Sequence, residues 1–165
     1  MKEPAVEKKG LQQLLAEPET YKKVGIIRLK MVREETCIYG KKKIATAKDS
    51  VDMVKQLFAH IDREMMVVVS FSTAMEPLAI EVVAIGGLDA CYIDVKNVFK
   101  HAILNNAGNI ICFHNHPSSQ LLPSREDEKI TRKLKEAGCL LGVKLNDHII
   151  LSEDGYYSFA EEGLL

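Results

Sequence analysis

The sequence predicts an α/β fold in which helices cover both faces of a mixed β-sheet. Two observations predict it. Apolar residues recur with helical spacing in three segments, 46–61, 94–108 and 124–138, and apolar or β-branched runs lie between and after them. The order of elements is therefore helix, two strands, helix, strand, helix and two strands. Long helices that alternate with strands are typical of an α/β/α sandwich.

The first helix and the two strands after it follow from residue spacing. The segment TAKDSVDMVKQLFAHI, residues 46–61, places five apolar side chains on one helical face: Val51, Val54, Leu57, Phe58 and Ile61. The runs MMVVVSF (65–71) and PLAIEVVAI (77–85) are rich in β-forming residues and are joined by a few small and polar residues. Together they predict a β-hairpin.

The second half of the chain adds two helices and three strands. The helical patterns at 94–108 and 124–138 both end at a glycine, Gly108 and Gly138, which predicts where these helices stop. Between them, NIICF (109–113) is continuously apolar, as is typical of a strand buried on both faces. The closing strands are expected in LLGVKLNDHIILS (140–152) and YYSF (156–159).

The pattern predicts one domain with an N-terminal extension. No linker divides residues 46–165, and their length suits a single core. In the extension, residues 1–45, the segment 11–21 predicts a short helix that Pro18 would stop. The segment VGIIRLKMV (24–32) alternates apolar with basic residues, which predicts a half-buried strand.

The charge balance does not support direct binding to nucleic acid. The chain has 22 Lys and Arg against 23 Asp and Glu, a net charge of −1. Proteins that bind nucleic acid usually carry a surplus of positive charge over the phosphates. The run Lys41-Lys42-Lys43 is interpreted as a solvated turn.

The cysteine spacing and hydropathy predict a cytoplasmic protein. The four cysteines lie far apart without a CxxC pair, which favours reduced thiols: Cys37, Cys91, Cys112 and Cys139. No apolar stretch has the length of a membrane span, and the N-terminus lacks the apolar segment of a signal peptide. No membrane partner is therefore expected.

The loop FHNHPSSQLLPSRED, residues 113–127, contains the clearest chemical signal. His114 and His116 are two residues apart, so both imidazoles leave an extended backbone on the same face, at the end of a buried strand. Imidazole nitrogens bind metal ions, and Asp127 is the candidate third ligand. The alternative is that S-x-x-D marks a helix start with Ser124 as N-cap. Both interpretations can hold, because a cap can aim a carboxylate at the strand end.

Together these residues form the pattern H-x-H, seven residues, S-x-x-D. The pattern resembles the JAMM metalloprotease motif of the JAB/MPN fold. The sequence over about residues 46–160 resembles the RadC family of prokaryotic JAB domains. This resemblance implies a deaminase-like α/β sandwich in which His114, His116 and Asp127 hold Zn²⁺ and Ser124 assists.

The sequence also departs from the family pattern. Ser119 stands where the family usually has glycine after Pro-Ser, and YIDVKN and FSTAM replace two further family stretches. These changes concern substrate contacts more than metal binding. Full-length RadC proteins also carry a DNA-binding helix-hairpin-helix, of which residues 1–45 give no sign.

The resemblance further implies an open zinc site with water in the fourth position and a glutamate as general base. Zinc would lower the pKa of that water from about 15.7 to about 7. Glu64 directly precedes the strand at 65–71, where such proteins place this glutamate, and is preferred. Glu81, in mid-strand, is second, and Glu76 lies in the hairpin turn. Ser124 is a candidate hydrogen-bond donor to the developing oxyanion, a role that competes with capping.

The remaining histidines and one cysteine are assigned lesser roles. Cys112 shares the face of His114 in a regular strand, so it is either an extra ligand or, as preferred, a small core residue. His148 is expected near the site or in the core. His60 and His101 lie in helical patterns and are expected to be structural or solvent-facing.

Two functions follow from these observations. The first is a zinc-dependent hydrolase that cleaves an amide or isopeptide bond in a peptide substrate whose identity the sequence does not give. The second, which the RadC resemblance implies, is a catalytically silent, metal-stabilised binding module linked to DNA repair or mobile elements. The position of Glu64 discriminates between them. A homo-oligomer is compatible with either function.

Overall fold

A computed structural model describes residues 24–28, 31–32, 40, 43–86, 93–118 and 120–165. The chain divides into two compact units, residues 1–34 and 35–165, and the site described below lies in the second. None of the described helices is both long and apolar enough to cross a membrane.

Several sequence predictions concern the N-terminal part of the chain or residues outside the described ranges. The helix predicted at 11–21 lies outside the described residues, as do Lys41, Lys42, Cys37, Cys91 and Ser119. Residues 24–28 and 31–32 form no strand, so the strand predicted over 24–32 is wrong for the residues that are described. An alternating pattern forms a strand only where a partner strand accepts its hydrogen bonds. The sheet that is described consists of strands from the second unit.

Five strands form one mixed sheet in the described part of the second unit. They are β1 (Met65–Phe71), β2 (Pro77–Ile85), β3 (Asn109–Asn115), β4 (Lys144–Ser152) and β5 (Gly155–Ser158). Their order across the sheet is β2-β1-β3-β4-β5. β3 and β4 run parallel, and all other neighbours are antiparallel. The predicted mixed sheet and its β1–β2 hairpin are confirmed.

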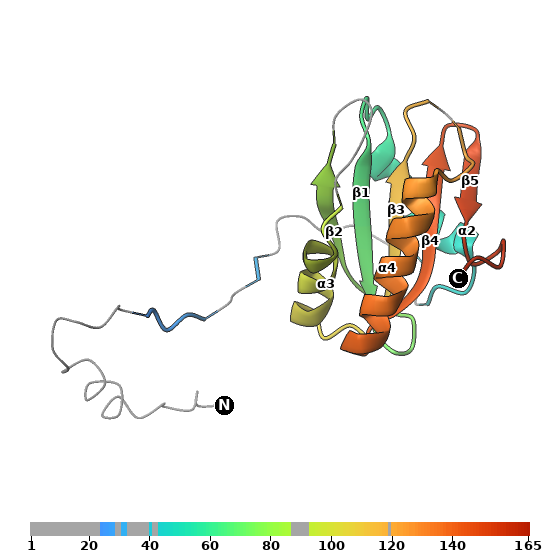
Figure 1. Ribbon diagram of the computed structural model, residues 1–165. Helices are drawn as coiled ribbons and strands as arrows, with labels where there is room; N and C mark the ends of the chain where they lie inside the picture. Colours follow the sequence, from blue (N-terminus) through green and yellow to red (C-terminus); the bar gives the residue numbers. More distant parts are fainter. Residues whose placement is uncertain (1–23, 29–30, 33–39, 41–42, 87–92, 119) are drawn as a thin grey trace, which may run out of the picture. The chain divides into compact units, whose positions relative to one another are not determined.

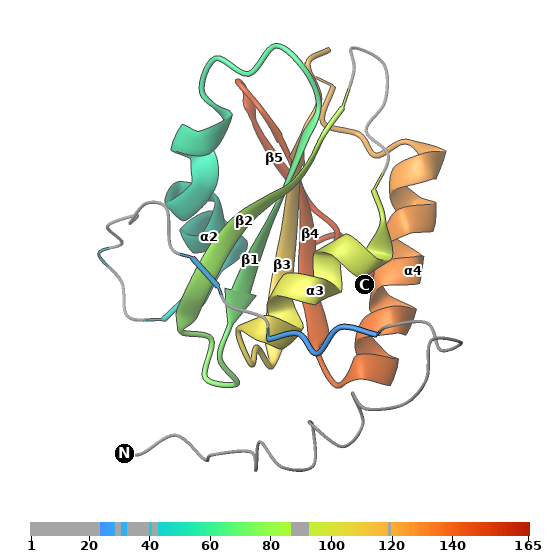
Figure 2. The ribbon, with the colours of Figure 1, turned by 90° about the vertical axis from the view of Figure 1, so that its left-hand side faces the viewer.

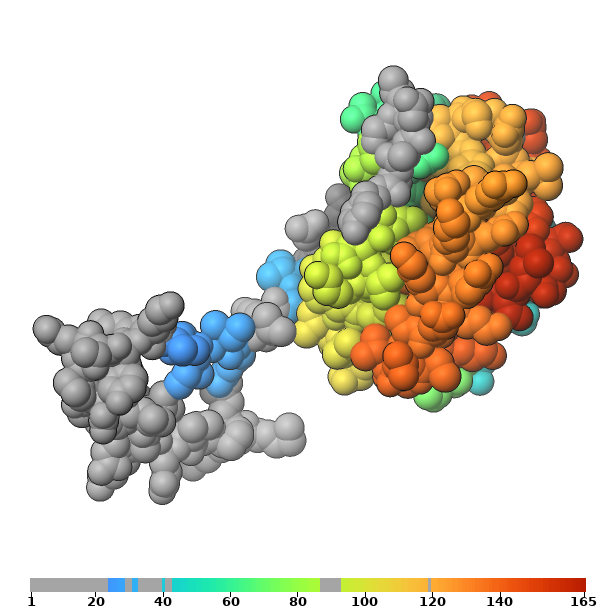
Figure 3. All heavy atoms as spheres, in the orientation of Figure 1, coloured from blue at the N-terminus to red at the C-terminus, as the bar shows by residue number. Residues whose placement is uncertain are grey.

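Helices cover both faces of the sheet. On one face lies α2 (Ala47–Val54), and on the other lie α3 (Val95–Leu104) and α4 (Arg125–Leu141), as Figures 1 and 2 show. The outer side of α4 reaches the molecular surface beside the C-terminal residues (Figure 3). The helix predicted over 46–61 is shorter than expected. The α-helix ends at Val54 and is followed by the 3₁₀ turn η1 (Lys55–Phe58). His60 then has a φ of 65°, which lies outside the right-handed helical region.

Two apolar cores lie on the two faces of the sheet. Alternate residues of β1 and β3 enter the core under α2: Met65, Val67, Val69, Phe71, Ile111 and Phe113. The residues between them enter the core under α3 and α4: Met66, Val68, Ile110 and Cys112. His114 continues this second series, because it lies two residues after Cys112. The strand that builds the α4-side core therefore also aims His114 toward α4.

The glycine that was predicted to end the last helix lies inside it. α4 continues to Leu141 and ends at Gly142, which has a φ of 70°. A Cβ atom at Gly138 would collide with the carbonyl oxygen of Val143 and lie 3.3 Å from the ring of Phe99. Gly138 therefore permits close packing of α4 rather than terminating it, and the prediction was wrong for this tertiary reason.

Candidate metal centre

Strand β3 places two histidines at one end of the sheet. His114 lies within the strand, between Met66 of β1 and Ile150 of β4, and its side chain is only 5% exposed. His116 follows the end of the strand, and its backbone N–H donates to the carbonyl of Leu151 at 3.2 Å. Because residues two apart share a face of an extended chain, both imidazoles lie on the α4 side of the sheet.

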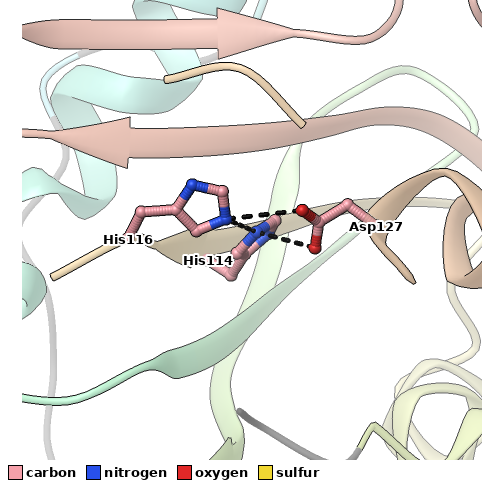
Figure 4. A group of neighbouring side chains, drawn as sticks. All are labelled: His114, His116 and Asp127. Atoms are coloured by element: carbon pink, nitrogen blue, oxygen red, sulfur yellow. Dashed lines mark hydrogen bonds and ion pairs between the residues drawn. The ribbon is translucent and has the colours of Figure 1, made fainter. Parts of the chain in front are cut away.

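The first turn of α4 brings Asp127 to the same place. Its Oδ1 lies 3.2 Å from Nε2 of His114, its Oδ2 lies 3.4 Å from Nε2 of His116, and the two Nε2 atoms are 3.0 Å apart. Figure 4 shows the carboxylate directed from the helix toward both rings. The structure thus brings together the three predicted ligands. Among the described residues they form the cluster of His, Cys, Asp or Glu side chains that could hold a metal ion.

Ser124 caps α4 and also orients Asp127. Its hydroxyl oxygen accepts from the backbone N–H of Asp127 at 3.1 Å, and the hydroxyl donates to Oδ2 of Asp127 at 2.6 Å. The backbone N–H of Ser124 donates to the same Oδ2 at 2.7 Å, which completes a capping box. The capping interpretation of S-x-x-D is therefore confirmed, and the same cap aims the carboxylate at the two histidines, as a metal site would require.

Each imidazole also has a hydrogen bond on its far side. Nδ1 of His116 lies 2.6 Å from the carbonyl oxygen of Gln120, and Nδ1 of His114 lies 2.9 Å from Nε2 of His148. A carbonyl oxygen only accepts, so Nδ1 of His116 carries the proton, and Nε2 of the neutral ring carries a lone pair. Such outer hydrogen bonds hold the rings of metal-binding histidines in place.

The spacing of the three donor groups fits a small metal ion. Bonds of about 2.0–2.1 Å in a tetrahedral zinc site place neighbouring donors roughly 3.3–3.4 Å apart. The separations of 3.0, 3.2 and 3.4 Å are close to this spacing. Two imidazoles and one carboxylate form a donor set that zinc takes in catalytic sites, with one position left for water or substrate. The residues present therefore fit the metal that the sequence predicts.

Burial and hydrogen bonding set the charges around this cluster. Burial alone would raise the pKa of Asp127, but its contacts with His114 and His116 and the hydrogen bond from Ser124 outweigh it and hold that pKa well below its ordinary value of 3.8. The hydrogen bond with Asp127 raises the pKa of His116 above 6.5, and burial lowers the pKa of His148 well below 6.5. Asp127 is therefore a carboxylate at neutral pH, the form that binds metal ions.

Glu64, the preferred candidate for the general base, lies next to the strand that pairs with β3. It directly precedes β1, two residues before Met66, and Met66 is the residue opposite His114. Glu64 itself precedes the paired residues of β1, and the pairing of Met66 with His114 brings the start of β1 beside the end of β3 that carries the histidines. The negative charge of Glu64 is also among the causes that raise the pKa of His116, after the hydrogen bond with Asp127.

Asn115, between the two histidines, holds the peptide groups on both sides of Glu64. Its Oδ1 accepts from the backbone N–H of Met65 at 2.9 Å, and its Nδ2 donates to the carbonyl of Arg63 at 3.0 Å. The side chain is buried, with the residue 8% exposed. The backbone of Glu64 is thus fastened to the same stretch of β3 that carries the histidines.

The two other candidate bases lie elsewhere. Glu81 is opposite Val68 in the β1–β2 pair, and its carboxylate contacts His101 of α3. Glu76 lies in the hairpin turn, at the end of β1 opposite to the histidines. Of the three glutamates, Glu64 is the one whose charge is among the causes that raise the pKa of His116.

The remaining predicted residues fall into the core or onto the surface. Cys112 is completely buried in the α4-side core, and burial raises the pKa of its thiol to about 12, so it is a core residue. His148 is also completely buried and lies directly behind His114, which satisfies both alternatives stated for it. His60 is exposed in a turn. Sequence reasoning missed Asn115 and Thr131, whose contacts depend on residues distant in the chain.

Comparisons with known proteins cover the same region. The family model described as RadC-like JAB domain matches residues 44–164. A UPF0758 protein of Thermotoga maritima is 42% identical over 110 residues, which are 67% of this chain and 50% of that protein. A UPF0758 protein of Salinibacter ruber is 39% identical over 117 residues, 71% of this chain and 50% of the relative. A third, from Flavobacterium johnsoniae, is 37% identical over 123 residues, 74% and 54% of the two chains.

The family match covers the part of the chain that forms the sheet and the candidate site. The chain spans about half the length of these curated relatives. Residues 44–164 include all five strands of the sheet and the His114, His116 and Asp127 cluster. The chain therefore belongs to the RadC-like JAB domain family.

Proposed function

We propose that this domain is a zinc-dependent hydrolase that cleaves an amide or isopeptide bond in a peptide substrate. One observation carries the proposal: His114, His116 and Asp127 present three donor groups at 3.0–3.4 Å from one another. The names of the curated relatives state no activity, and the chain spans about half of their length, so the reaction is proposed from the site alone.

Zinc supports this chemistry because it polarises a carbonyl group and lowers the pKa of a water molecule in the open position from about 15.7 to about 7. The two imidazoles would hold the ion through Nε2, and the carboxylate of Asp127 would supply the third bond. Ser124 holds that carboxylate in its orientation through the 2.6 Å hydrogen bond from its hydroxyl group. The low exposure of the side chains of His116 and Asp127, 12% and 13%, limits access of bulk water to the donors.

In this proposal Glu64 is the general base. It takes a proton from the attacking water and returns it to the nitrogen of the leaving amine, while the bond between that nitrogen and the carbonyl carbon breaks. Its place directly before β1, whose Met66 pairs with His114, and its charge effect on His116 support the assignment. The contact of Glu81 with His101 argues against Glu81 in this role.

Two matched variants test the proposal. Glu64→Gln keeps the size of the side chain but cannot accept the proton, so hydrolysis should fall by at least about 100-fold, the lower range for a general base. Zinc content and thermal stability should stay at the wild-type level, because Glu64 is not one of the three donors. Glu81→Gln, measured in parallel, should keep the activity.

The assay uses zinc-loaded protein and a panel of peptide and isopeptide substrates. If Glu81→Gln loses activity and Glu64→Gln does not, the assignment of the base is wrong. If zinc-loaded wild type turns over no substrate, the domain is instead a metal-stabilised binding module, the second function that the family resemblance implies.

A further inference from the structure

A row of buried hydrogen bonds runs behind His114. Nδ1 of His114 lies 2.9 Å from Nε2 of His148 on β4, and Nδ1 of His148 lies 2.6 Å from the hydroxyl oxygen of Thr131 on α4. That hydroxyl lies 2.6 Å from the backbone carbonyl oxygen of Asp127. Thr131, His148 and His114 are 2%, 0% and 4% exposed. The row begins at the backbone of one metal-site residue and ends at the ring of another.

The direction of every hydrogen bond in this row follows from the acceptor at its end, the backbone carbonyl of Asp127. The carbonyl of Asp127 can only accept, so the single hydroxyl proton of Thr131 is donated to it. The oxygen of Thr131 must then accept from Nδ1–H of His148. A completely buried imidazole whose ring nitrogens contact a threonine and a histidine, and no carboxylate, stays neutral, because an unpaired buried charge is costly. Nε2 of His148 therefore carries a lone pair.

The same reasoning assigns the proton of His114. Because Nε2 of His148 accepts, Nδ1 of His114 must donate to it, so the neutral, metal-binding form of the His114 ring carries its lone pair on Nε2. This lone pair faces Nε2 of His116 and the carboxylate of Asp127. In the other tautomer, a proton on Nε2 of His114 would occupy the direction in which the metal binds.

We propose that Thr131 and His148 are positioning residues that hold His114 in the one tautomer able to bind the metal. The inference rests on the metal site proposed above and extends it to two residues that touch neither metal nor substrate. The ring of His148 is itself held by stacking on Phe159, with centroids 5.1 Å apart and an angle of 12° between the planes. The row thus has a fixed hydrogen-bond direction and a fixed ring orientation.

Thr131→Val and Thr131→Ser form the matched pair that tests this proposal. Valine keeps the shape of threonine but lacks the hydroxyl, so His148 loses the acceptor that fixes its tautomer. Serine keeps the hydroxyl and should behave like the wild type. Affinity for Zn²⁺ alone, measured by competition with a chromogenic chelator, should fall about 10–100-fold in Thr131→Val, as is usual when an outer partner of a metal-binding histidine is removed.

Long-range ¹H–¹⁵N NMR of the metal-free protein gives a second readout that a purely structural role of Thr131 would not change. In the wild type and Thr131→Ser, His114 and His148 should each be protonated on Nδ1. In Thr131→Val, both should show a mixture of tautomers. A wild-type His148 protonated on Nε2, or equal Zn²⁺ affinities in Thr131→Val and wild type, would overturn the proposal.

A second pair of variants decides the matter if Thr131→Val does not fold. His148→Phe keeps a ring that can stack on Phe159 but cannot accept from His114, so it should bind Zn²⁺ more weakly. His148→Gln offers an amide that can both accept from His114 and donate to Thr131, so it should restore part of the affinity. Equal affinities would overturn the proposal. A wild type that binds no Zn²⁺ would contradict the metal site itself, and the NMR measurement would still decide on the tautomers.

Discussion

The amide oxygen of Asn115 lies 2.9 Å from the backbone nitrogen of Met65, so the residue between the two histidines holds the start of the neighbouring strand. Its amide nitrogen donates to the carbonyl of Arg63 on the other side of Glu64. A single buried side chain therefore satisfies one donor and one acceptor of the backbone. These two hydrogen bonds also fix the position of the Glu64 backbone relative to His114 and His116.

Replacing Asn115 by alanine should lower the free energy of unfolding by about 1–3 kcal/mol, the cost of leaving a buried backbone group without a partner. Urea denaturation measures this change. Asn97→Ala on the exposed side of α3 is the control and should stay within about 0.5 kcal/mol of wild type. Zinc content should be unchanged in both variants. Equal stability of Asn115→Ala and Asn97→Ala would show that the two hydrogen bonds of Asn115 contribute nothing.

Two capping boxes in the described part of the chain allow helix stability to be separated from metal binding. Ser124 and Thr46 cap α4 and α2 in the same way, but only Ser124 also donates to a residue of the metal cluster. Ser124→Ala and Thr46→Ala should each reduce the free energy of unfolding by about 0.5–2 kcal/mol. Only Ser124→Ala should weaken Zn²⁺ binding, by about 10-fold or more, because Asp127 loses its orienting hydroxyl. Equal Zn²⁺ affinities in the two variants would contradict the orienting role.

Asp147 should make stability depend on pH in a defined direction. Burial raises its pKa above 3.8, and hydrogen bonds from Ser158 and from the backbone of Ala160 and His148 offset only part of this effect. The folded state therefore binds this proton more tightly than the unfolded chain. Its contribution to stability is complete below 3.8 and is lost as the pH rises through the raised pKa.

Asp147→Asn removes this titration and keeps the shape of the side chain. The free energy of unfolding of wild type minus that of Asp147→Asn should therefore fall as the pH rises from about 4, and then become constant. Urea unfolding at a series of pH values checks the sign. A difference that grows with pH would mean that hydrogen bonding, rather than burial, dominates at Asp147.

The local pattern of the sequence predicts most of the fold because each core face follows a simple period. The β-rich run of β1 and the apolar run of β3 are both visible in the chain, and each strand contributes residues to both cores. The end of α4 was misplaced because Gly138 makes room for the carbonyl oxygen of Val143, just beyond the helix, and for the ring of Phe99, which is remote in sequence. No local rule distinguishes a glycine that stops a helix from one that lets another element approach.

The candidate site likewise contains residues that the sequence pattern predicts and residues that it does not. The pattern H-x-H and S-x-x-D is local, so it predicted that His114, His116 and Asp127 come together. Thr131 and His148 are 17 residues apart, and Asn115 and Met65 are 50 apart. One sequence does not reveal pairs at such separations, because Thr131 meets His148 only when α4 packs on β4, and Asn115 meets Met65 only when β1 pairs with β3.

Zinc binding by wild type and His116→Ala tests the central claim most directly. Each protein is dialysed to equilibrium against Zn²⁺, and the bound metal is measured together with the circular dichroism spectrum. We predict one zinc per wild-type chain, none in His116→Ala, and folded spectra for both, because the two apolar cores do not include the metal cluster. A wild-type protein that remains folded yet holds almost no zinc would contradict the account, as would equal zinc content in His116→Ala.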